Sequence, residues 1–194
     1  MRERILAAAY ACISRYGIAK TTVEDVARES GLSRASVYRT FPGGRDELIR
    51  EVVAWEIGRF FADLAHSVAE ATGFEEVVEA ALLHAHRAIG QHEVLHKLLL
   101  TEPERLVPAI TMETSRFVPL IAAFAEPYLA HETLRPGIDR REAADYVARM
   151  VVSHIAAPGR WDLDDPVQVQ ALVRAEILAG IVEGPSGPSE REAV

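Results

Sequence analysis

The segment from Ser30 to Arg45 combines arginines with hydroxyl-bearing and small side chains. It contains three arginines and no acidic residue. An arginine can donate two parallel hydrogen bonds to guanine, and a serine hydroxyl can donate to or accept from a base edge. Tyrosine and threonine hydroxyls suit phosphate oxygens, and such contacts fix the position of a protein on a duplex rather than its choice of sequence. We therefore expect this segment to bind double-stranded DNA.

A second group of reactive side chains is formed by His92, Glu93 and His96, which match the HExxH pattern of zinc proteases. On a helix the two histidines would share one face and could hold a zinc ion beside a glutamate general base. A third ligand would have to come from elsewhere. The glutamates downstream are Glu102, Glu104 and Glu113. The pattern leaves open a zinc-dependent hydrolase or a metal-sensing site, beside the simpler interpretation of polar residues near a helix start.

Two short helices with a tight turn between them are predicted to position the arginine-bearing segment. Thr21 or Thr22 can cap the first helix, with an acidic residue three positions later to close a capping box. Gly31 can end this helix in the left-handed conformation without Cβ strain. Ser33 can cap the second helix, which Pro42 and two glycines stop. This is a helix-turn-helix pattern, whose second helix is the one that enters a major groove.

The first 50 or so residues resemble the TetR family of bacterial one-component repressors. The matching residues are Thr21-Thr22, Val26-Ala27, Gly31-Leu32-Ser33, Ser36-Val37-Tyr38, Phe41 and Leu48. The resemblance and the side-chain chemistry together predict the DNA-binding residues Thr22, Ser33, Arg34, Ala35, Ser36, Tyr38, Arg39, Thr40 and Arg45. The chain departs from the family after Phe41. The loop is one residue longer than usual, so the basic residue that opens the next helix is Arg45.

The composition is that of a packed globular protein, with 49% hydrophobic and 26% charged residues in a chain of 194. There is no apolar run long enough to span a bilayer and no signal peptide, and the single cysteine agrees with a reducing compartment. We therefore expect a cytoplasmic protein without a membrane partner. No glycine-rich phosphate loop, GxSxG elbow or CxxC pair occurs, and no cofactor or enzymatic activity is predicted.

The net charge of −8 is divided unevenly along the chain. Residues 1–50 carry nine Lys and Arg against six Asp and Glu, a balance of +3, whereas residues 51–194 carry twelve against twenty-three, a balance of −11. The positive charge is therefore gathered where the helix-turn-helix lies. The acidic remainder should be repelled by nucleic acid.

Helical periodicity dominates the whole sequence, and no strand pattern outcompetes it. The helices expected outside the helix-turn-helix are 3–16, 46–71, 74–89, 92–101, 114–130, 139–157 and 166–182. The predicted fold is all-α, with about nine helices. We expect a three-helix DNA-binding domain over residues 1–45, a ligand-binding and dimerisation domain over 46–183, and a disordered tail over 184–194.

The last predicted helix is apolar nearly all round between Ala171 and Val182. A surface helix needs only one apolar stripe, so this one needs burial on two sides. Together with the helix before it, it would form a four-helix interface between two copies, which is the usual dimer contact in the proteins that this chain resembles. A homodimer would present two reading helices to a palindromic operator. The alternative is that the pair forms the core of a monomer.

The resemblance also implies a cavity for a small-molecule effector between the helices of the second domain. The apolar candidates for its lining are Leu82, Leu98, Phe117, Leu120, Phe124, Tyr128 and Met150, and the polar candidates are His86 and Glu102. The leading hypothesis is a homodimeric repressor that such an effector releases from its operator. The alternatives are the zinc-dependent or metal-sensing protein above, and a helical dimer that binds a protein partner and no longer reads DNA.

Overall fold

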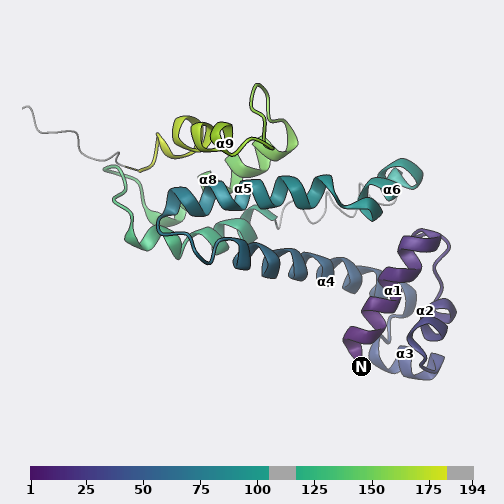
Figure 1. Ribbon diagram of the computed structural model, residues 1–194. Helices are drawn as coiled ribbons and strands as arrows, with labels where there is room; N and C mark the ends of the chain where they lie inside the picture. Colours follow the sequence, from purple (N-terminus) through teal and green to yellow (C-terminus); the bar gives the residue numbers. More distant parts are fainter. Residues whose placement is uncertain (105–116, 183–194) are drawn as a thin grey trace, which may run out of the picture. The chain divides into compact units, whose positions relative to one another are not determined.

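The computed structural model is all-α, which confirms the predicted fold class, and it describes residues 1–104 and 117–182 (Figure 1). Residues 1–63 and 91–104 belong to one compact unit, here called the head unit, and residues 64–90 and 117–182 to another, the body unit. The predicted domain boundary at residue 45 stays a prediction. The predicted tail over 184–194 lies outside the described residues, as does the predicted start of a helix at Thr114.

The head unit contains α1 (Arg2–Tyr16), α2 (Val23–Ser30), α3 (Arg34–Thr40), the greater part of α4 (Gly44–Ser67), and α6 (Glu93–Thr101). One apolar cluster holds these helices together, and its members include Ile5, Ala9, Cys12, Val26, Val37, Phe41, Leu48 and Leu98. Burial of these side chains gives the short helices α2 and α3 the stability that helices of 8 and 7 residues lack on their own.

The carboxyl end of α1 is fastened to α6 by polar contacts. The Lys97 ammonium donates to the carbonyl of Ser14 at 2.6 Å, and the backbone N–H of Ala19 donates to Oε2 of Glu102 at 2.8 Å. Gly17 ends α1 with a φ of +86°, and a Cβ there would lie 1.9 Å from Oε1 of Glu102. The position therefore requires glycine for its backbone conformation, and the missing Cβ also leaves room for the Glu102 carboxylate.

The body unit contains α5 (Phe74–Gly90), a helical stretch over 117–125, the 3-10 turn η1 (Tyr128–His131), α8 (Arg140–Ala156) and α9 (Pro166–Leu172). Asp139 caps α8 by accepting from the N–H of Glu142 at 2.8 Å, as predicted, and Pro166 is the first residue of α9. The last helix is wrong as a single α-helix to Val182. After Leu172 the chain forms a π-helical segment, η2 (Val173–Leu178), and then turns.

The core of the body unit takes most of the large apolar side chains of α9 and η2. Leu172, Val173 and Ile177 are completely buried against α5 and α8 residues such as Leu82 and Val147. One of the two sides of this apolar segment is thus covered by the chain itself. The residues that remain exposed on it are three alanines (Ala171, Ala175 and Ala179), Gly180 and Arg174. In the part of the chain that the structure describes, no helix is long and apolar enough to cross a membrane.

Candidate nucleic-acid interface

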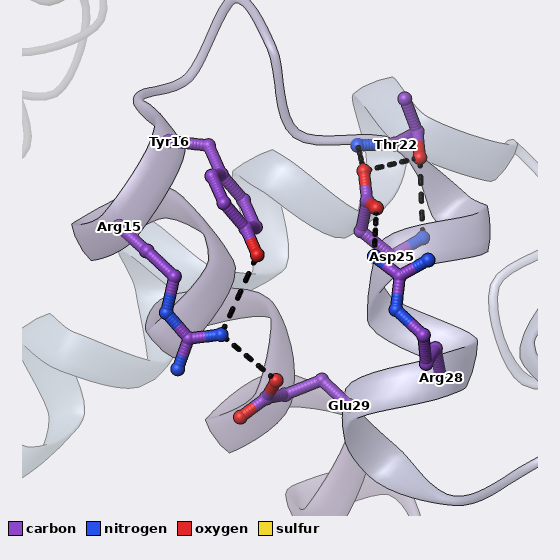
Figure 2. Close-up of polar contacts among 6 residues, drawn as sticks. All are labelled: Arg15, Tyr16, Thr22, Asp25, Arg28 and Glu29. Atoms are coloured by element: carbon purple, nitrogen blue, oxygen red, sulfur yellow. Dashed lines mark hydrogen bonds and ion pairs between the residues drawn. The ribbon is translucent and has the colours of Figure 1, made fainter.

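The first helix of the motif, α2, is closed at both ends by local hydrogen bonds. Thr22 forms the capping box with Asp25, since its hydroxyl oxygen accepts from the Asp25 N–H at 3.1 Å and its own N–H donates to Asp25 Oδ2 at 3.2 Å (Figure 2). The hydrogen bond from the Thr22 hydroxyl is the main reason why the pKa of Asp25 is lowered. Thr21 is buried instead and donates to the carbonyl of Gly17. Gly31 adopts φ 64° and ψ 30°, the left-handed conformation predicted for it.

The second helix of the motif is held by a cap and a buried anchor. The Ser33 hydroxyl accepts from the N–H of Ser36 at 3.1 Å, which confirms the predicted cap. Val37 and Phe41 point inward and are 1% and 0% exposed. With these two side chains fixed in the core, the opposite face of α3 has to turn outward, because helix positions three to four apart share a face.

The outward face of α3 carries the predicted DNA-binding side chains. The exposed ones are Ser33, Arg34, Ala35, Tyr38 and Arg39, and those partly exposed are Ser36 and Thr40. Arg39 donates to the Ser36 hydroxyl at 3.3 Å, and the Ser33 and Ser36 hydroxyls lie 3.0 Å apart. The Thr40 hydroxyl donates to the Ser36 carbonyl at 2.9 Å, so its proton is engaged within the helix. The structure therefore brings a row of hydrogen-bond donors together on one short helix.

Arg34 is joined to α2 by an ion pair that sequence reasoning missed. Its Nη1 lies 2.9 Å from Oε1 of Glu24, ten residues earlier. Glu24 follows Thr21 by three residues, so the sequence alone suggests only a capping-box role for it, and Asp25 takes that role. The contact depends on how α2 packs against α3, which local spacing does not reveal.

Arg45 lies at the start of α4 and is bound to protein carbonyls. Its Nε donates to the carbonyl of Thr21 at 2.8 Å, and its Nη2 donates to those of Ile18 and Ala19. The side chain is 32% exposed. These bonds tie the first turn of α4 to the loop before α2. The phosphate contact predicted for Arg45 stays a prediction, and in the free chain these donors are used within the head unit.

The residues predicted to line an effector cavity do not form one cluster. Leu82 is completely buried in the body core. Tyr128 and Met150 are partly buried and pack against this core, and the ring centroids of Phe124 and Tyr128 lie 5.6 Å apart. Phe117 is partly exposed, Leu120 is 41% exposed, and His86 Nε2 lies 3.6 Å from Asp164 Oδ1. Leu98 and Glu102 belong instead to the head unit. Leu98 is part of its apolar core, and the Glu102 carboxylate accepts a hydrogen bond from the N–H of Ala19. The effector site stays a prediction.

Two open grooves are present on the described surface, and neither is lined by a predicted effector residue. The first, of about 420 Å³, lies between α1 and α2 and is lined by residues such as Arg4, Ala11 and Arg28. The second, of about 300 Å³, is lined by Ala123, Glu126, Pro127, Ala130 and Arg140.

The HExxH pattern is divided between a cap and a helix. His92 is the N-cap of α6, and its Nδ1 accepts from the N–H of Leu95 at 3.1 Å. Its Nε2 lies 3.8 Å from Oε2 of Glu56, while His96 is exposed within the helix. Among the described residues there is no group of three His, Cys, Asp or Glu side chains arranged to hold a metal ion. Helix capping is therefore what the structure shows His92 to do.

A capped helix pair whose second helix exposes arginine, serine and tyrosine around a buried anchor defines a helix-turn-helix DNA-binding protein. Residues 5–52 match the model of the family described as bacterial regulatory proteins, tetR family. An HTH-type transcriptional regulator of Mycobacterium tuberculosis is 27% identical over 177 residues, which cover 90% of this chain and 88% of that protein. The chain is a TetR-family DNA-binding transcriptional regulator.

Solved structures share the fold at low sequence identity. A TetR-family transcriptional regulator from Mesorhizobium loti is 19% identical, with a TM-score of 0.63 over 94% of this chain and 96% of that one. The transcriptional regulator FadR from Bacillus subtilis, solved in complex with stearoyl-CoA, is 15% identical, with a TM-score of 0.54 over 90% of this chain and 98% of that one. These likenesses extend beyond the helix-turn-helix to nearly the whole chain.

Proposed function

We propose that the protein is a cytoplasmic, homodimeric repressor, which binds a palindromic operator and is released from it by a small-molecule effector. The proposal assigns it no enzymatic activity. The observation that carries it is the exposed face of α3, which holds Arg34, Tyr38 and Arg39 outward while Val37 and Phe41 anchor the helix in the core. Long donors fixed on a rigid helix are what a protein needs to read base edges in the major groove.

The predicted contacts fall into two classes on this helix. Arg34 and Ser36 are proposed to meet base edges, and Ala35 is small enough to let the helix approach them. A phosphate contact is proposed for the hydroxyl of Tyr38. Phosphate contacts are also proposed for Thr22, Thr40 and Arg45, whose donors must first leave Asp25, the Ser36 carbonyl and the Thr21 carbonyl. Ser33 and Arg39 are proposed to face the duplex as well. Phosphate contacts set the register of the protein on DNA, whereas base contacts choose the sequence.

A second copy of the chain is proposed to pack on α8 and the segment after α9. The surface left there after the core has formed includes exposed alanines at positions 171, 175 and 179 beside Arg174, which pairs with Glu75 of α5, and Tyr146 of α8 is 38% exposed. The Tyr146 hydroxyl donates to the Glu176 carbonyl at 3.2 Å, which joins α8 to η2. A two-fold axis at this place would present two α3 helices to half-sites about 34 Å or a multiple of it apart.

The effector is proposed to act on α4, which runs along the chain from the head unit into the body unit, and on α6, which begins just after the chain returns to the head unit. The first turn of α4 is fastened to the loop before α2 through Arg45, and α6 is fastened to α1 through Lys97 and Glu102. A ligand can shift DNA binding only by its different affinity for the two states of these helices. The Bacillus subtilis FadR of similar fold, solved with stearoyl-CoA, supports a search that begins with acyl compounds.

Binding of the DNA upstream of the protein's own gene tests the proposal. A labelled duplex of this DNA and a scrambled duplex of equal length are titrated with protein at several salt concentrations. Preference for the upstream duplex, with affinity that falls steeply as salt rises, is expected, because each phosphate contact releases counterions. Equal binding of both duplexes, or no dependence on salt, would contradict it.

The effector is sought separately among small molecules that raise the melting temperature of the free protein. A true effector should also weaken binding of the upstream duplex. A compound that stabilises the protein and leaves its DNA affinity unchanged is not an effector.

A further inference from the structure

The ion pair between Glu24 and Arg34 places a carboxylate on the DNA-facing side of the head unit. Nη1 of Arg34 lies 2.9 Å from Oε1 of Glu24, and the two side chains are 57% and 63% exposed. The sequence from Ser30 to Arg45 has no acid of its own. Glu24 therefore brings from α2 a negative charge that the reading segment lacks.

Neither stability nor affinity explains a carboxylate at this place. Exposed ion pairs of this kind contribute little to folding. A carboxylate close to the phosphates of a duplex is repelled by them, so it lowers overall affinity. The remaining effect is on the direction of the guanidinium. Arginine has donors on Nε, Nη1 and Nη2 in a rigid plane, and a carboxylate that holds one of them fixes the plane.

The hydrogen bond to Glu24 leaves a complete recognition edge of Arg34 unused. Only Nη1 donates to Glu24, whereas Nε and Nη2 have no hydrogen-bond partner among the described residues. Nε and Nη2 form a two-donor edge that matches the O6 and N7 acceptors of guanine. A guanidinium already ordered in this way loses less conformational freedom when it binds.

We propose that Glu24 is a positioning residue that aims the Nε–Nη2 edge of Arg34 at a guanine and keeps this guanidinium away from phosphates. Glu24 then lowers the affinity of the protein for any duplex and increases its preference for the operator sequence. This inference rests on the proposed function, since it requires that α3 reads an operator.

A matched pair of variants isolates the effect of position from the effect of charge. Glu29 lies on the same helix as Glu24 and pairs with Arg15 on α1, with 3.3 Å between its Oε2 and Arg15 Nη1 (Figure 2). Glu24→Ala and Glu29→Ala each remove one exposed carboxylate and one ion pair from α2. Only Glu24 contacts an arginine of α3. Far-UV circular dichroism establishes that both variants are folded.

Selection from random duplexes first identifies the operator and the guanine whose preference Arg34→Ala abolishes. Competition between this operator and one with that guanine replaced then measures the preference of each variant. A bidentate contact discriminates between bases only while both of its hydrogen bonds are aligned, so Glu24→Ala should reduce the guanine preference by about threefold to tenfold. Glu29→Ala should keep the wild-type preference. The double variant, Glu24→Ala with Arg34→Ala, should show the same lack of guanine preference as Arg34→Ala alone.

Two results would overturn the positioning role while leaving the proposed function in place. In one, Glu24→Ala and Glu29→Ala strengthen binding to every duplex by the same factor, with the guanine preference intact. In the other, Glu24→Ala changes the base preference at an operator position where Arg34→Ala leaves the preference unchanged. A wild-type protein that enriches no sequence overturns the proposed function, and the positioning role with it.

Discussion

The head and body units bury apolar side chains in the same way but leave different surfaces to the outside. On α3 of the head unit the exposed residues are long and charged, such as Arg34 and Arg39. On the last helical segment of the body unit they include three alanines, at 171, 175 and 179, with Arg174 as the long exception after Ala171. A surface that reads base edges needs donors that reach beyond the backbone, whereas a surface that packs on another helix needs side chains small enough for close approach.

The units also differ in how they satisfy polar groups. In the helix-turn-helix the helix starts are closed by side chains three residues away, as Thr22 and Ser33 show. In the body unit Glu79 Oε1 and His154 Nε2 are buried without a hydrogen bond, although His154 Nε2 lies 3.6 Å from Glu176 Oε2. Among the described residues, the two buried side-chain atoms found without a hydrogen bond thus both belong to the body unit.

The largest expected effect is on the body core. Leu82→Ala removes a completely buried side chain and should lower the free energy of unfolding by about 2–5 kcal/mol, because the cavity left behind collapses only in part. Chemical denaturation measures the loss. Leu120→Ala, at a position 41% exposed, is the control and should have little effect. Equal losses in the two variants would show that Leu82 is not part of a packed core.

The next effect is on DNA binding. Arg34→Ala should weaken operator binding by about 1–3 kcal/mol, or roughly fivefold to 150-fold, because a base contact is lost. Arg87→Ala removes an equal charge from an exposed position on α5 of the body unit. It should leave the affinity nearly unchanged. If both variants lose the same affinity, net charge and not the α3 surface governs binding, and the contrast between the units fails.

Removing one cap from each unit should separate stability from function. Ser33→Ala and Asp139→Ala each delete a side chain that accepts a hydrogen bond at a helix start, and each should cost about 0.5–2 kcal/mol of stability. Only Ser33→Ala should also reduce operator affinity, since α3 carries the reading face. Thermal unfolding and fluorescence anisotropy of a labelled operator give the two quantities. Loss of DNA binding in Asp139→Ala at temperatures where it is folded would argue against this division.

The smallest effects concern two carboxylates of α5 that should respond to pH in opposite directions. Burial, with a contribution from nearby Glu75, raises the pKa of Glu79, whereas hydrogen bonds from the backbone N–H and hydroxyl of Thr72 lower the pKa of Glu76. Charged Glu79 therefore destabilises the fold above its raised pKa, and the penalty disappears as pH falls. Charged Glu76 stabilises the fold above the ordinary carboxyl pKa, and this contribution is lost as pH falls through its lowered pKa.

Glutamine substitutions make this contrast measurable. At pH 7, Glu79→Gln should raise the melting temperature and Glu76→Gln should lower it. Both differences from wild type should shrink towards acidic pH, where the wild-type carboxyls are protonated as well. Melting curves between pH 3 and 8 are the measurement (roughly the range over which carboxyls titrate). Shifts of the same sign in both variants would contradict the assigned causes.

The helix-turn-helix could be predicted from the sequence almost residue by residue, because its signals act over three or four positions. The capping pair Thr22 and Asp25, the left-handed Gly31 and the cap at Ser33 are all local. The contacts that the sequence did not reveal join residues far apart. Glu24 meets Arg34 across a helix pair, Arg45 binds the carbonyl of a residue 24 positions away, and Glu102 binds a backbone group 83 positions away.

The body unit was harder to predict for a related physical reason. Helical periodicity located α5, α8 and the start of α9 closely, since glycine, proline and Asp139 mark their ends. It could not tell burial in the chain's own core from burial against a second copy, because both require the same apolar side chains. It also gave no sign of the π-helical segment Val173–Leu178. Leu98 and Glu102, which were predicted to bind an effector, lie in the head unit, and their effector role stays a prediction.

The structure of the protein bound to its selected operator tests the central claim most directly. The outward face of α3 is predicted to lie in the major groove, with Nε and Nη2 of Arg34 within hydrogen-bonding distance of a guanine. A complex in which α3 faces away from the duplex, or in which Arg34 contacts only phosphates, would contradict the account.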